Sequence, residues 1–154
     1  MNIIWGDSQN PALCRHLCAF VERSIGGYGL GFGNAVAMGV FDGIELAGAV
    51  VFHNWEPRAG VIEMSAAAVS RRWLTRPVLQ RMFDYAFEDA GCQMAVLRVS
   101  ERNKPMIRIA RAYGFSGTFI PRLRGRDEGE FIFTLTDDDW RGSRFNRKSL
   151  SLSH

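Results

Sequence analysis

Residues 66–87 read AAAVSRRWLTRPVLQRMFDYAF, which is a small apolar run, a basic segment and a longer amphipathic segment. The apolar run ends at Val69 and is typical of a strand. The amphipathic segment has apolar residues at i and i+4, the pattern of a helix packed on one face; they are Val78, Leu79, Met82, Phe83, Ala86, Phe87 and Ala90. Thr75 and Pro77 suit the N-cap and first turn of this helix, and Gly91 suits its end. The stretch therefore predicts a strand, a loop and a helix in direct succession.

The predicted loop carries Arg71, Arg72 and Arg76. The first N–H groups of a helix lack partners within the helix, and together with the helix dipole they favour an anion. Guanidinium groups add bidentate donors that suit phosphate oxygens. We therefore expect an anion site here, of the kind that binds a pyrophosphate. Plain solvated surface charge is the alternative.

The rest of the chain extends this unit into one domain with a mixed sheet. Asp42-Gly43 between two apolar runs is a strong hairpin signal, and Asn10-Pro11 suits the start of a helix. The expected strands are 2–5, 35–41, 45–53, 61–69, 93–99, 115–120 and 130–136; the expected helices are 10–25, the one that ends at Gly91, and 103–113. The order β-α-β-β-β-α-β-α-β-β predicts an α/β fold with a mixed central sheet flanked by helices.

The net charge of +3 is concentrated at the C-terminus of the 154-residue chain. Residues 141–154 hold four basic residues and no acid, so residues 1–140 alone carry a charge of −1. We expect residues 1–140 to form the domain and residues 141–154 to be a basic, disordered tail, which either attracts an acidic partner or only aids solubility. A nucleic-acid-binding module is disfavoured, because the domain is near neutral and lacks RNP-like or zinc-finger spacing.

Other classes are disfavoured by what the sequence lacks. No apolar run approaches the ~20 residues of a membrane span, and residues 1–9 do not resemble a signal peptide, so a cytoplasmic protein is expected. The three cysteines and three histidines show no zinc-ligand spacing, so no metal is expected. Cys14 and Cys18 are expected to be packing thiols.

The segment EMSAAAVSRRWLTRPVLQRMFDYAFEDAGCQMAVLRVSERNKPMIRIARAYGF, residues 63–115, resembles the GNAT superfamily of N-acetyltransferases. Two features carry the resemblance: a strand that turns through a basic loop into a helix, and Asn103 opening a helix that ends at Gly114-Phe115. The resemblance spans residues 42–140. It is nearest to the branch of ribosomal-protein N-terminal acetyltransferases and to related phage-borne members.

This resemblance implies acetyl-CoA as co-substrate and direct attack by a primary amine in a ternary complex. The acceptor would be a protein N-terminus or a small molecule, and a homodimer is a common assembly in the family. The implied cofactor-binding residues are Ala68, Val69, Arg71, Arg72, Leu74, Thr75, Arg76 and Asn103. The small side chains of residues 66–68 would let pantetheine approach, and N–H groups of the strand ending at Val69 would polarise the thioester carbonyl.

The loop departs from the family pattern Q/R-x-x-G-x-G/A. Ser70, Trp73 and Thr75 stand where the pattern has Q/R, G and G/A. We expect the guanidinium groups and the Thr75 hydroxyl to compensate for the missing glycines. A loop that no longer binds CoA is the alternative.

The resemblance also directs the choice of catalytic residues. Glu63, within a strand, is the expected general base, with Glu45 and His53 as reserves. The family's tyrosine position holds Ala110, so Ser65 or a water is expected to protonate the thiolate, and Tyr113 is expected to pack structurally. The acceptor would enter between the glycine-rich loop at 26–34 and the loop at 122–130. A non-catalytic acyl-CoA-binding protein on the same fold is the alternative function.

Overall fold

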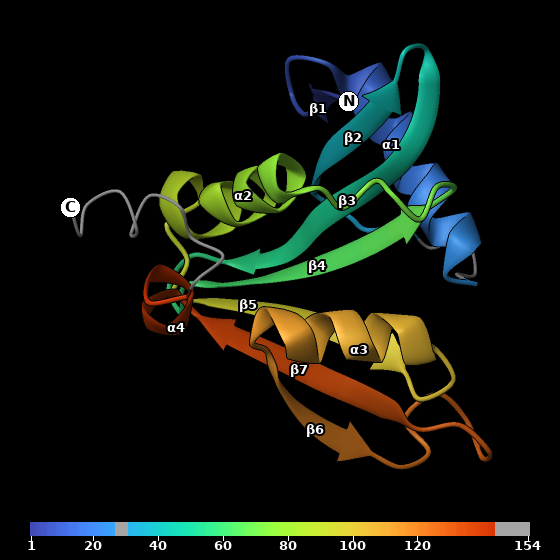
Figure 1. Ribbon diagram of the computed structural model, residues 1–154, viewed down its shortest axis with the longest axis vertical. Helices are drawn as coiled ribbons and strands as arrows, with labels where there is room; N and C mark the ends of the chain where they lie inside the picture. Colours follow the sequence, from blue (N-terminus) through green and yellow to red (C-terminus); the bar gives the residue numbers. More distant parts are fainter. Residues whose placement is uncertain (27–30, 144–154) are drawn as a thin grey trace.

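A computed structural model describes residues 1–26 and 31–143. Its centre is a seven-stranded sheet of order β1-β2-β3-β4-β5-β7-β6 (Figure 1). Only β4 and β5 pair in parallel, and the other neighbours are antiparallel. The strands are β1 (Asn2–Gly6), β2 (Val36–Asp42), β3 (Glu45–Glu56), β4 (Val61–Ala68), β5 (Met94–Ser100), β6 (Ser116–Ile120) and β7 (Glu130–Thr136). The predicted mixed sheet and the predicted order of its elements are confirmed.

Helices cover the two faces of the sheet unequally. Helix α1 (Pro11–Ser24) packs Leu17 and Val21 against one face of β2 and β3. Helices α2 (Arg76–Asp84) and α3 (Lys104–Tyr113) share the opposite face, where the rings of Phe83 and Tyr113 stack at 4.6 Å. Figure 1 shows α2 and α3 on the near side and α1 behind β2 and β3. Among the described helices, none therefore covers the α1 face of β5, β7 and β6.

The β2–β3 hairpin follows the Asp42-Gly43 signal. Asp42 pairs with Glu45, and Gly43 has a φ of 63°, which a residue with a side chain rarely adopts. Strand β3 then continues to Glu56, beyond the predicted end at residue 53. His53 consequently lies inside the sheet, opposite Glu63, and not at a strand end as predicted.

The helix predicted to run to Gly91 changes its geometry before it ends. Helix α2 stops at Asp84 and continues as a π-helical turn, η1 (Tyr85–Asp89). The wider turn brings both Ala86 and Phe87 into the core, where they are at most 2% exposed. Gly91 follows with a φ of 68°. Apolar spacing alone could not distinguish the two kinds of turn.

One helix was not predicted. Thr136 accepts a hydrogen bond from the Asp139 N–H (3.2 Å) and begins α4 (Asp137–Arg141). Trp140 is fully buried, with its ring 5.0 Å from that of Phe87. Arg141, the first residue of the predicted tail, is the last residue of this helix, and residues 144–154 lie outside the described residues.

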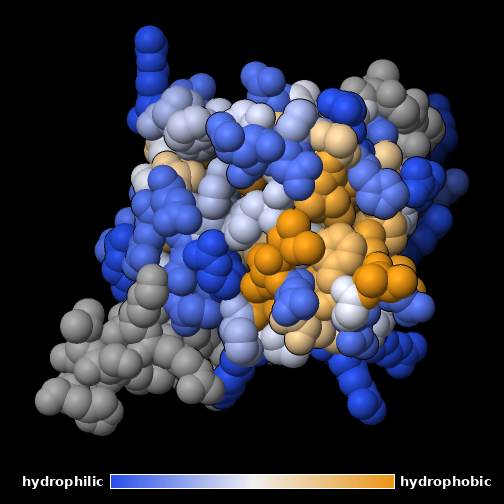
Figure 2. Space-filling model, turned by 90° about the horizontal axis from the view of Figure 1, so that it is seen from above, coloured by the Kyte–Doolittle hydropathy of each residue, from blue (hydrophilic) through white to orange (hydrophobic). Residues whose placement is uncertain are grey.

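The surface over the β1 edge of the sheet carries a patch of apolar side chains bordered by charged ones (Figure 2). Exposed apolar residues of this end of the sheet include Ile4 in β1 and Ile44 in the β2–β3 turn.

Among the helices of residues 1–26 and 31–143, none is long and apolar enough to cross a membrane.

Candidate active site

A cleft forms where β4 and β5 separate. The two strands are paired from Val61 and Met94 as far as Met64 and Leu97. Beyond these residues both strands continue, to Ala68 and Ser100, and stay paired with β3 and β7 but no longer with each other. A cleft of about 660 Å³ occupies the gap. A volume of this size is typical of a site for a small molecule.

One wall of the cleft carries three polar side chains from β3 and β4. Glu63 and Ser65 lie on the same face of β4, because they are two residues apart, and His53 is the register partner of Glu63 on β3. His53 Nε2 lies 2.8 Å from Ser65 Oγ and 3.7 Å from Glu63 Oε2. Asn54 Nδ2 also donates to Glu63 Oε1, at 3.0 Å. The wall therefore combines a carboxylate, an imidazole and a hydroxyl within one set of contacts.

The imidazole of this wall is neutral near pH 7. His53 is 5% exposed, and its ring packs 4.7 Å from that of Phe32. Burial lowers the pKa of His53 below its usual value, and the carboxylate of Glu63 offsets this only in part. A neutral imidazole at Ser65 can exchange a proton with the hydroxyl in either direction.

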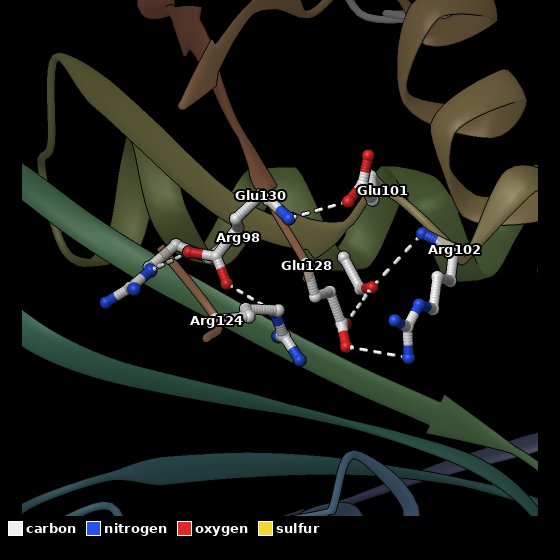
Figure 3. A network of polar contacts seen from close by, with 8 residues as sticks. Arg98, Glu101, Arg102, Arg124, Glu128 and Glu130 are labelled. Carbon is white, nitrogen blue, oxygen red and sulfur yellow. Dashed lines mark hydrogen bonds and ion pairs between the residues drawn. The ribbon is translucent and has the colours of Figure 1, made fainter. Parts of the chain in front are cut away.

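The facing wall carries a buried carboxylate between two arginines. Glu130, the first residue of β7, has a side chain only 2% exposed. Arg98 Nε, from β5, lies 2.5 Å from its Oε1, and Arg124 Nε lies 2.5 Å from its Oε2. Figure 3 shows the two guanidinium groups converging on this one carboxylate. All three residues line the cleft.

The 121–129 loop is tied to the end of β5 next to these arginines. Glu128 accepts from the Ser100 hydroxyl and pairs with Arg102 Nη1 at 3.2 Å. Gly129 N–H donates to Glu101 Oε1 at 2.7 Å (Figure 3). Glu101 N–H in turn donates to the Gly129 carbonyl at 3.2 Å. These contacts fix the loop against the turn that precedes α3. Arg124 of this loop lines one cleft together with Gly26 and Phe32, which belong to the other of the two loops between which the acceptor is predicted to enter.

The loop between β4 and α2 is anchored by its tryptophan. Trp73 is 6% exposed and lies against Gly48 of β3, where an added Cβ would be 2.6 Å from two ring atoms of the indole. The Val69 and Ser70 N–H groups both donate to the Ala47 carbonyl, at 2.8 and 3.2 Å. The N–H of Val69, at the end of the strand whose N–H groups are predicted to polarise the thioester, is therefore already paired within the protein.

The arginines of this loop are exposed around the start of α2. Thr75 is the N-cap, as predicted, with its Oγ1 accepting from the Val78 N–H at 3.4 Å. Arg71, Arg72 and Arg76 are exposed, while Leu74 is half-buried. The cleft reaches Ala68, directly before this loop. A helix N-terminus surrounded by guanidinium groups has the donors and the charge that a pyrophosphate requires.

Helix α3 and its two ends carry the remaining residues that the family resemblance singled out. Asn103 lines the cleft and caps the helix, because its Oδ1 accepts from the Met106 N–H at 3.3 Å. Gly114 ends the helix with a φ of 116°. Ala110 is buried, and Tyr113 stacks on Phe83 within the core, where burial raises the pKa of its hydroxyl. Tyr113 therefore packs structurally, as predicted.

Cys14 and Cys18 do not line the cleft. Cys14 and Cys18 are half-buried on α1 as packing residues, and burial together with the neighbouring Cys14 raises the pKa of Cys18 to about 12. Within the ranges that the structure describes, no group of three or more His, Cys, Asp or Glu side chains is arranged to hold a metal ion.

Sequence reasoning did not single out Arg98 or the role of Glu130. One signal was present, because Arg98 interrupts the apolar run between Leu97 and Val99. Its partner Glu130 is supplied by β7, thirty-two residues later, and spacing along the chain does not reveal it.

No protein-family model matches the sequence, and no curated protein sequence matches it. Solved structures do match the fold. Spermidine/spermine N-acetyltransferase SpeG from Vibrio cholerae, in mutant forms, is 16% identical over 70% of each chain, with a TM-score of 0.62. A chimera of the Vibrio cholerae SpeG and hSSAT is 12% identical over 91% of this chain and 99% of that one, with a TM-score of 0.71. A dodecameric SpeG structure has a TM-score of 0.60 at 16% identity, over 69% and 67% of the chains. The chain therefore has the α/β fold of the GNAT N-acetyltransferases.

Proposed function

We propose that this protein is an acetyl-CoA-dependent N-acetyltransferase that acts on a primary amine in a ternary complex. The observation that carries the proposal is the cleft between β4 and β5, which meets Glu63, His53 and Ser65 on one side and leads to the arginine-rich loop on the other. The acetyltransferase folds of similar structure support the same class of reaction. The acceptor amine and the family branch remain predictions.

The cofactor side would be formed by the start of α2 and by the strand edge. Arg71, Arg72 and Arg76 supply exposed guanidinium groups next to a helix N-terminus. Ala66, Ala67 and Ala68 present small side chains to the cleft, so an extended chain such as pantetheine can lie close to β4. Asn103, whose Oδ1 is used by its own helix, still has its side-chain amide N–H groups for a ligand. These residues fit acetyl-CoA although Trp73 replaces a family glycine.

The chemistry would proceed by direct attack. Glu63 accepts a proton from the ammonium form of the acceptor, directly or through a water, and so frees the nitrogen lone pair. The nitrogen then bonds to the thioester carbon while the carbon–sulfur bond breaks. Ser65 donates a proton to the thiolate and is reprotonated through the neutral imidazole of His53, 2.8 Å away, by the second proton that the nitrogen loses as the amide forms. The products are the acetylated amine, the free thiol and the proton held by Glu63, so atoms and charges balance.

Two measurements test the proposal in sequence. Calorimetric titration of acetyl-CoA should show micromolar binding that is lost in the Arg72→Ala, Arg76→Ala double variant. The control double variant Arg15→Ala, Arg58→Ala removes the same charge from exposed positions elsewhere and should bind normally. Failure of the wild-type protein to bind acetyl-CoA would sink the proposal.

The second measurement separates an enzyme from a binding protein. Thiol release with a panel of amines should fall by about 10²- to 10⁴-fold in Glu63→Gln, the usual loss on removing a general base, with acetyl-CoA affinity unchanged. Micromolar binding of acetyl-CoA without thiol release from any amine would instead favour the non-catalytic acyl-CoA-binding protein. Ala110 at the family's tyrosine position is the observation that keeps this second function in consideration.

A further inference from the structure

The charges of the cleft are separated between its two walls. On β4, Glu63 is the acid, beside a neutral His53. On the facing wall, Arg98 and Arg124 share the single carboxylate of Glu130, which leaves one positive charge in excess. The cleft is therefore negative at one wall and positive at the other.

The two arginines keep donors available for a ligand. Each guanidinium contacts Glu130 through Nε, so the terminal Nη groups are not needed for that pair. The side chains are 46% and 31% exposed, whereas Glu130 is 2% exposed. Glu130 thus fixes both arginines from behind while their outer edges face the cleft. A carboxylate accepts from such paired donors with good geometry.

The neighbouring acids do not compete for these donors. Glu128 is engaged by Ser100 and Arg102, and Glu101 accepts from the Gly129 N–H. Figure 3 shows these acids directed at partners other than Arg98 and Arg124. Glu128 and Glu101 therefore do not neutralise the positive charge in excess at Arg98 and Arg124, which line the cleft.

The spacing of the walls sets the size of the ligand. Glu63 pairs with Val96 on β5, and Arg98 is two residues further along the same face. If the strands stayed paired, strand geometry would place the Cα atoms of Glu63 and Arg98 roughly 8 Å apart. Because the pairing ends at Met64 and Leu97, the two residues lie at the point where the strands begin to separate. Side chains reaching from both walls leave room between them for one small molecule.

We infer that the acceptor is an amino-acid-like zwitterion, with its amine at Glu63 and its carboxylate on Arg98 and Arg124. This inference rests on the proposed function, because it names the substrate class of the same site. A polyamine fits poorly, since its second ammonium group would face two guanidinium groups. The substrate class therefore differs from the spermidine named for the SpeG structures of similar fold.

The test uses pairs of acceptors that differ only in the carboxylate. Each common amino acid is compared with the amine that remains after its decarboxylation, and spermidine is included, with thiol release as the readout. We expect kcat/KM to favour the amino acid by about 10- to 100-fold, the range for hydrogen bonds to a charged group. Arg98→Gln and Arg124→Gln should abolish that preference. Preference for the decarboxylated amine or spermidine, or an unchanged preference in the variants, overturns the inference.

Two further variants control for charge and folding. Arg98→Lys keeps the charge and the pair with Glu130 but loses the fork of donors, so it should fold normally and keep only part of the preference. Arg141→Gln removes an arginine that also pairs with a carboxylate, Asp137, but at the other end of β7, and should keep the full preference.

A binding measurement separates failure of this inference from failure of the proposed function. The Nε–Hε signals of Arg98 and Arg124 in ¹⁵N-labelled protein are followed while an amino acid or its decarboxylated amine is added. If no amine releases thiol, the transferase proposal fails. A shift with the amino acid alone, lost in Arg98→Gln, would still support the carboxylate site. Equal or absent shifts with both compounds would overturn it.

Discussion

Gly48→Ala tests whether Trp73 positions the arginine-rich loop. The new Cβ would lie 2.6 Å from Cδ2 and Cε3 and 3.0 Å from Cγ of Trp73. Cγ is the ring atom bonded to Cβ, and Cδ2 and Cε3 belong to the same rigid ring system. The clash therefore cannot be relieved by moving only the outer atoms of the side chain. The indole must move, and Arg71, Arg72 and Thr75 on either side of it must move with it.

The expected loss of stability is modest. Overpacking of this kind costs ~1–3 kcal/mol, and the lower chain entropy of the unfolded alanine variant offsets ~0.4–1 kcal/mol. The net loss is about 0–2.6 kcal/mol, which for a domain of this size lowers Tm by at most roughly 10 °C. The loss of one or two charge-assisted hydrogen bonds to a pyrophosphate should weaken acetyl-CoA binding by about 10- to 100-fold.

Gly117→Ala is the matched control. Its Cβ would lie 2.5 Å from a ring atom of Phe133, but in β6, away from the β4–α2 loop. Thermal unfolding should show similar losses in both variants, while calorimetric titration with acetyl-CoA should show weaker binding only for Gly48→Ala. Equal affinities in the two variants would refute the reasoning that Trp73 holds the loop in place.

Three further predictions concern single residues of the site. Because the unfolded chain binds a proton at His53 more readily than the folded one, the free energy of unfolding should decrease as pH falls below about 6.5. Denaturant titrations at pH 7 and pH 5 should show a smaller decrease for His53→Gln than for the wild-type protein. The control variant His16→Gln, at an exposed position, should show the same decrease as the wild-type protein. Thr75→Ala should lose about 1 kcal/mol of stability by removing the cap on Val78, and Thr75→Ser should retain it, so equal losses in the two would contradict a capping role. Ser65→Ala should lower kcat without changing the affinity for acetyl-CoA, and a normal kcat in steady-state assays would show that another group or a water protonates the thiolate.

Local patterns predicted the elements that carry most of the fold. The Asp42-Gly43 turn, the Thr75 and Asn103 caps and Gly114 each act within a few residues, so the sequence alone located them. The α4 helix was missed because a run of three aspartates before Trp140 shows no apolar stripe, and its stability comes from burial of one tryptophan against η1.

The arrangement of the candidate site follows from the sequence only in part. Glu63 and Ser65 are predicted separately, as base and as proton donor, and alternation along β4 places both on one face of the strand. The contact of His53 with both residues depends on the β3–β4 register, which extended further than predicted. The pairing of Glu130 with Arg98 and Arg124 joins two strands and a loop, so only the folded structure reveals it.

The separation of β4 from β5 gives this sheet a free edge in its middle. Free edges usually lie at the border of a sheet, where another chain can add a strand and start aggregation. Here the edge past Met64 is only a few residues long and is recessed within one molecule, so a foreign strand has little access to it. A narrow, extended molecule with amide groups of its own can still reach it. The separation of β4 from β5 thus favours narrow, extended ligands, and its short length limits aggregation through the unpaired edge of β4.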